Sequence, residues 1–93
     1  MPPDPLAELT RLQEQEERAV DTMEEHRRQI ATLEALLEDA KRRGEAPGAI
    51  EARIEAAEDG VTRAEREIAA LRERIAAAEK ALPADLRDGD EEA

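Results

Sequence analysis

The stretch that decides the fold is residues 50–82, which read IEARIEAAEDGVTRAEREIAALRERIAAAEKAL. Apolar residues recur there at alternating steps of four and three, at Ile50, Ile54, Ala57, Val61, Ala64, Ile68, Leu71, Ile75, Ala78 and Leu82. A spacing of about 3.5 residues, sustained over this length, is the pattern of a coiled coil, in which one apolar stripe packs against a partner helix. The sequence therefore predicts a long amphipathic helix that requires a partner.

The same spacing recurs in the first half of the chain. Its positions are Leu9, Leu12, Glu16, Ala19, Met23, His26, Ile30, Leu33, Leu37 and Ala40. We call these ten residues the first stripe and the ten above the second stripe. Because the two stripes match in length and spacing, each is the natural partner of the other.

Both helices have recognisable ends. Asp4 can accept hydrogen bonds from the first free amides, and Pro5 suits the first helical turn. Gly44 supplies the left-handed residue that commonly follows a helix, and Pro47 restarts the chain. Pro83 ends the second helix. The expected organisation is a short lead at 1–4, a helix at 5–43, a turn at 44–46, a helix at 47–82 and a disordered acidic tail at 83–93.

A connection this short makes the two helices antiparallel neighbours. Facing residues in such a pair have a constant sum of residue numbers, and a sum of 87 mostly places large side chains opposite small ones. It pairs Leu9 with Ala78 and Ile30 with Ala57. The predicted fold is all-α, an antiparallel two-helix coiled-coil hairpin. Two helices leave the stripes only half covered, so we expect two hairpins to associate into a four-helix bundle.

Gly60 interrupts a segment that otherwise favours helix, at a cost of up to about 1 kcal/mol relative to alanine. The heptad spacing passes through it without a skip, which favours one continuous helix. The alternative is a break at Gly60, with Thr62 and Glu65 forming a capping box for a third helix.

Composition narrows the classes of function. The chain has 93 residues, of which 42% are charged, with no aromatic residue, no cysteine and a net charge of -11. Because the chain is this acidic, most of its surface repels phosphates. We therefore expect no direct binding to nucleic acid. It has no long apolar run and no signal-peptide pattern at its start, so we expect no membrane span and a cytoplasmic location by default. Abundant alanine and the excess of arginine over lysine suggest a bacterial or phage genome.

Apolar residues outside the two stripes form the candidate interaction surface, which consists of Leu6, Val20, Leu36, Ala69, Ala70, Ala76 and Ala77. Helix propensity alone explains the alanines equally well, whereas a functional interpretation makes them a surface for close approach of another helix. The candidate contact at the hairpin tip is Lys41, Arg42 and Arg43. These cations offset the helix dipole, and the alternative is a contact with a phosphate or an acidic partner.

Two stripe positions are polar, Glu16 and His26. His26 is expected to lie beside Val61, with Gly60 leaving room for the imidazole, and the alternative is a pH-sensitive switch of register or association. Glu16 lies near the open end of the hairpin, where its carboxylate can reach water, and the alternative is that it specifies register or partner.

With one histidine and no cysteine, we expect no catalytic residues, no cofactor and no metal site. The predicted function is therefore a non-enzymatic interaction or assembly module, such as an adaptor, scaffold or small structural subunit, which packs against its own copies or another helical protein. The alternative is an acidic decoy that imitates nucleic acid and occupies a nucleic-acid-binding protein.

Overall fold

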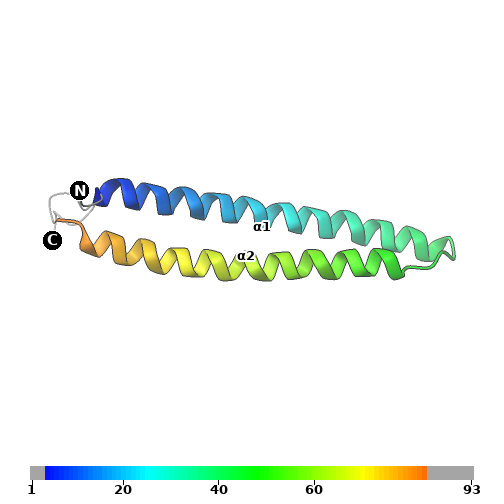
Figure 1. Cartoon of the computed structure of the whole chain (residues 1–93). Helices are drawn as coiled ribbons and strands as arrows, with labels where there is room; N and C mark the ends of the chain where they lie inside the picture. The colour runs from blue at the N-terminus through cyan, green and yellow to red at the C-terminus, as the bar shows by residue number, and fades with distance from the viewer. Residues whose placement is uncertain (1–3, 84–93) are drawn as a thin grey trace, which may run out of the picture.

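The computed structural model describes residues 4–83. Its two helices, α1 (Pro5–Arg42) and α2 (Gly48–Ala81), lie antiparallel and side by side along their whole length (Figure 1). The molecule measures 65 × 31 × 14 Å. The chain is therefore an all-α helical hairpin, as predicted. We call the connection between the helices the tip, and the end where α1 begins and α2 ends the open end. Apart from Asp4 and Pro83, the predicted lead and tail lie outside the described residues.

α1 begins at a side-chain cap. The backbone of Asp4 is extended, and its Oδ1 accepts a hydrogen bond from the amide of Leu6 at 3.1 Å. Pro5 is the first helical residue, a position where the missing N–H costs no helical hydrogen bond. A cap of this kind stabilises a helix by roughly 0.5–2 kcal/mol.

The turn at the tip depends on a glycine. Gly44 has a φ of 72°, the left-handed conformation predicted for it. Its amide donates to the carbonyl of Lys41 at 3.2 Å, and the next amide, that of Glu45, donates to the carbonyl of Ala40 at 2.9 Å. This pair of bonds is the Schellman motif, which satisfies carbonyls left free at a helix end. α1 ends at Arg42, one residue before the predicted end, because the residue after it serves as the C-cap.

α2 is also shorter by one residue at each end than the predicted helix at 47–82. Pro47 is its N-cap and not its first residue: the Pro47 carbonyl accepts the first helical bond, while its ring nitrogen has no proton to donate. At the other end Leu82 is extended, with φ of -70° and ψ of 146°. The following Pro83 causes this, because a proline ring disfavours helical geometry in the residue before it.

α2 runs without interruption through Gly60. The predicted continuity of this helix is confirmed. The alternative, a third helix capped by Thr62, is wrong, because the whole of Gly48–Ala81 forms one helix.

The two stripes form the interface between the helices, and every one of their twenty residues is buried or half-buried. The most buried are Leu12, Ala19, Ala40, Ala57, Ala64, Ile68, Leu71 and Leu82. Four of these form a core cluster nearer the open end than the tip, namely Leu12, Ala19, Ile68 and Leu71, and Val20, Met23, Ile75 and Ala78 pack against it. No side chain in the described part of the chain is wholly removed from solvent, which reflects the thinness of a two-helix interface.

Contacts across the interface agree with the predicted register. Glu16 bonds to Arg72, and these numbers add up to 88. The ring of His26 lies against Gly60, and these numbers add up to 86. A slip of one heptad would give a sum of 94 and move each facing residue by about 10 Å along the helix axis. The helices therefore pair close to the sum of 87.

Engineered disulfides test this register. The chain has no cysteine of its own. The double variant Leu12→Cys/Ile75→Cys should form an intrachain disulfide on mild oxidation, because both residues belong to the same core and a disulfide needs Cα atoms within about 7 Å. Mass spectrometry of the unreduced protein measures the yield. The control is Leu12→Cys/Leu82→Cys, and efficient crosslinking of that pair would show that the register is shifted by one heptad.

Candidate functional site

Glu16 is tied to the opposite helix by an ion pair. Its Oε2 accepts a hydrogen bond from Nε of Arg72 at 2.6 Å, and the Glu16 side chain is 25% exposed. The Arg72 side chain is 67% exposed, so solvent screens the pair and it contributes at most about 1 kcal/mol. Glu16 therefore has a direct partner across the interface, which sequence reasoning missed. The predicted sum of 87 for facing residues points to this partner, because Arg72 directly follows the residue predicted to face Glu16.

His26 occupies the space that Gly60 leaves open. The imidazole is half-buried, and its Nδ1 lies 3.4 Å from Oε1 of Gln29. A Cβ atom placed on Gly60 would lie 2.7 Å from Nε2 of His26, closer than Cβ contacts in proteins. This is the arrangement that the sequence suggested for the imidazole. With the imidazole in this position, the two residues fit together because Gly60 lacks a side chain.

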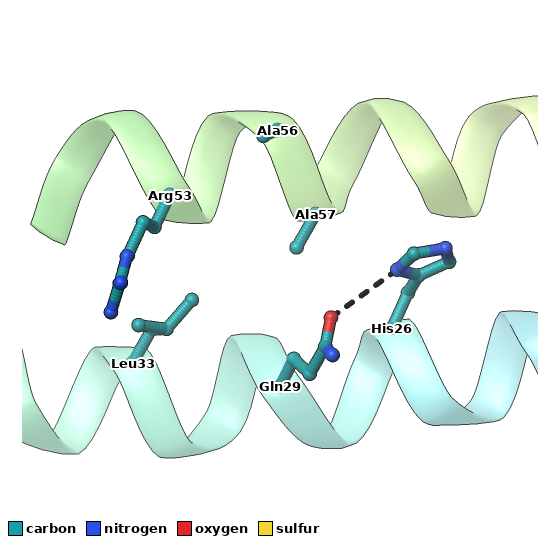
Figure 2. Close-up of a pocket in the computed structure, with 6 residues that line it drawn as sticks. All are labelled: His26, Gln29, Leu33, Arg53, Ala56 and Ala57. Atoms are coloured by element: carbon teal, nitrogen blue, oxygen red, sulfur yellow. Dashed lines mark hydrogen bonds between the residues drawn. The ribbon is translucent and has the colours of Figure 1, made fainter.

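Two shallow hollows open on one side of the hairpin. The first, of about 390 Å³, is lined by His26, Gln29, Leu33, Arg53, Ala56 and Ala57. Figure 2 shows the side chains of His26, Gln29, Leu33 and Arg53 between the two helices that form it. The second, of about 480 Å³, is lined by Gln15, Arg18, Ala19, Thr22, Glu67, Ala70, Leu71 and Arg74.

Heptad spacing shows that the two hollows lie on the same side of the hairpin. On α1, Gln15 and Gln29 are two heptads apart, and on α2, Arg53 and Arg74 are three heptads apart. Residues separated by whole heptads lie in one row along a packed helix. We call this side the groove flank. It is mixed in charge and rich in small or uncharged polar residues.

The opposite side differs in charge, and we call it the acidic flank. Its row on α2 consists of exposed residues at heptad spacing, Glu51, Glu58, Glu65, Arg72 and Glu79. Two of them reach α1: Arg72 bonds to Glu16, and Glu65 lies 3.3 Å from Arg27. This row carries four acids and one base, whereas the groove-flank row carries two bases, Arg53 and Arg74, and one acid, Glu67. The net charge of α2 as a whole does not show this difference between the two flanks. The difference becomes visible when charges are counted separately for each heptad row.

The residues of the candidate interaction surface differ in burial: one packs against the hairpin core, and the others are exposed to solvent. Leu6 and Leu36 are 41% and 48% exposed, which makes them the exposed large apolar residues of the described chain. Val20 is half-buried and packs against the hairpin's own core. The four alanines at 69, 70, 76 and 77 are exposed, and Ala70 lines the second hollow.

The basic tip residues are all exposed. Lys41 and Arg42 lie in the last turn of α1, where their charges oppose the negative end of the helix dipole. Nη2 of Arg43 lies 3.1 Å from Oδ2 of Asp39, one turn earlier. Dipole compensation and local pairing therefore account for the structure of this segment.

Within residues 4–83, no group of three or more histidine, aspartate or glutamate residues is arranged to hold a metal ion. Neither described helix combines the length and the apolar character that crossing a membrane requires. No protein-family model, curated protein or solved structure matches the chain.

The contact between His26 and Gly60 is testable by a double-mutant cycle. Gly60→Ala should destabilise the hairpin by up to about 2 kcal/mol, because the cost of moving the imidazole away from the new Cβ outweighs the gain in helix propensity. In a His26→Ala background the same change should stabilise it by up to about 1 kcal/mol, because the gain in helix propensity remains and the overlap is gone. Urea unfolding of the four proteins gives the coupling energy.

The matched control is Gly48→Ala at the start of α2, where an added Cβ meets no atom within 4 Å. It should leave stability unchanged or slightly raised in both backgrounds. If Gly60→Ala has the same effect with and without the imidazole, the interpretation of Gly60 as a space for His26 is wrong.

Proposed function

We propose that this chain is a non-enzymatic protein–protein interaction or assembly module, in which helix faces pack as a coiled coil against its own copies or another helical protein. One observation supports the proposal: the hairpin leaves part of its own apolar surface exposed to solvent. No described side chain is wholly removed from solvent, and Leu6 and Leu36 remain about half exposed although the two helices pair along their full length.

The energetics favour association. Stripe residues such as Ile30, Leu33 and Ile54 are only half-buried. Complete burial of a side chain of this size contributes roughly 1.5–3 kcal/mol, of which the hairpin alone gains only a part. A second pair of helices laid against the first would cover much of the remainder, as in a four-helix bundle. The proposed partner is therefore helical and, in the simplest case, a second copy.

The alternative function, an acidic mimic of nucleic acid, receives less support from the charge distribution. A mimic needs acids in regular and uninterrupted rows. Here Arg27 pairs with Glu65 across the interface, and Arg28 pairs with Glu25 on α1 at 2.9 Å. Arginines thus neutralise part of the negative surface. We therefore favour the assembly module.

Association makes a direct prediction about mass and melting. Light scattering at micromolar concentration should give twice the chain mass of 10.3 kDa. The melting temperature measured by circular dichroism should rise with protein concentration, because mass action stabilises a folded dimer. A well-folded monomer whose melting temperature is independent of concentration would contradict self-association and leave binding to another helical protein as the remaining form of the proposal.

A further inference from the structure

We propose that a second copy of this chain docks on the groove flank, antiparallel to the first and related to it by a two-fold axis near the middle of α1. The inference rests on the proposed self-association and assigns the surface and the direction that it uses. In a two-fold dimer the same surface of both copies meets itself, so each flank can be judged by how well it fits its own copy.

Charge argues against the acidic flank. Its α2 row would place Glu51, Glu58 and Glu79 against the same row of the other copy, and like charges brought together at an interface are strongly unfavourable. The α2 row of the groove flank contains charges of both signs, because it includes the bases Arg53 and Arg74 and the acid Glu67. On α2 a copy can therefore approach the groove flank without a row of like charges.

The ends of the groove flank specify the antiparallel direction. Near the open end Glu8 pairs with Arg11, and near the tip Arg43 pairs with Asp39 at 3.1 Å. Glu8 and Arg43 lie whole heptads from Gln15, so all three lie in one row that runs along α1 to its C-cap. Arg11 and Asp39 lie in the adjacent row, that of Arg18.

An antiparallel copy brings these two ion pairs together with opposite signs. Arg11 of one copy lies opposite Asp39 of the other, and Glu8 lies opposite Arg43. The midpoint of either pairing falls at about residue 25 of α1, where we place the axis. In a parallel two-fold copy α1 would instead lie over α2 of the other copy, and these two ion pairs would not meet.

The same axis gives Leu36 a place to pack. Leu36 is 48% exposed and lies three heptads from Gln15, so it belongs to the groove flank. Rotation about the axis brings it to the second hollow of the other copy, beside Gln15, Ala70 and Arg74. A contact along the 65 Å hairpin and about one helix diameter wide covers roughly 800 Å² of each copy, the size of a stable interface.

Adjacent alanines provide a matched test of the flank. Ala70 and Ala77 lie in one heptad row on the groove flank, whereas Ala69 and Ala76 lie one helical turn after Glu65 and Arg72 of the acidic flank. The double variants Ala70→Glu/Ala77→Glu and Ala69→Glu/Ala76→Glu make the same change in composition, at exposed sites of the same helix. Sedimentation equilibrium on the full chain measures the dimer Kd, and circular dichroism verifies folding.

The groove-flank variant should raise the dimer Kd by at least about tenfold, which corresponds to about 1.4 kcal/mol, while the control should change it by less than about threefold. Equal effects, or a larger effect of the control, would overturn the groove flank as the docking surface although self-association would stand. A wild-type chain that stays monomeric would overturn self-association itself, and this inference with it.

Single cysteines test the direction. Because the chain has no native cysteine, the variants Arg11→Cys and Asp39→Cys can be mixed and oxidised gently. The antiparallel dimer should give mainly the mixed disulfide between the two variants. Predominant disulfides between two Arg11→Cys chains would overturn the antiparallel arrangement.

Discussion

The structure depends on the burial of two apolar stripes against each other. Neither helix would be stable in isolation, because a long amphipathic helix exposes its apolar stripe to water unless a partner covers it. The short turn at the tip supplies that partner within the same chain and sets the antiparallel direction. The register then follows from the matching of large and small residues, with Ala19 facing Ile68 in the most buried region. The remaining features are adjustments to this interface.

The two polar positions on the first stripe show how the interface accommodates residues that do not suit it. Glu16 extends to the edge, where Arg72 and solvent share its charge. His26 lies against the opposite helix, which makes room for the ring by omitting a side chain at Gly60. The glycine weakens the helix but relieves the packing, because an alanine there would overlap the ring. Both residues disfavour a slipped register, since a shift by one heptad would remove the partner of each.

Most of the fold could be predicted from the sequence because it rests on local chemistry and on periodicity. The cap at Asp4, the left-handed Gly44 and the stripes all follow from residue type and spacing. The predicted end of α2 at Leu82 is one residue late, because Pro83 disfavours helical geometry in Leu82. The partner of Glu16 depends on how the two helices are placed along each other. Periodicity identifies the buried face of each helix, but which exposed residues of the two helices meet depends on the register between them.

The common position of the two helix ends has a geometric consequence. Pro5 and Ala81 lie at the same pole of the hairpin, and the turn lies at the other pole of a 65 Å rod (Figure 1). In an antiparallel pair the two open ends would face outward in opposite directions. Such a pair would act as a molecular ruler: anything joined to the chains at those poles would be held apart by about the length of one hairpin.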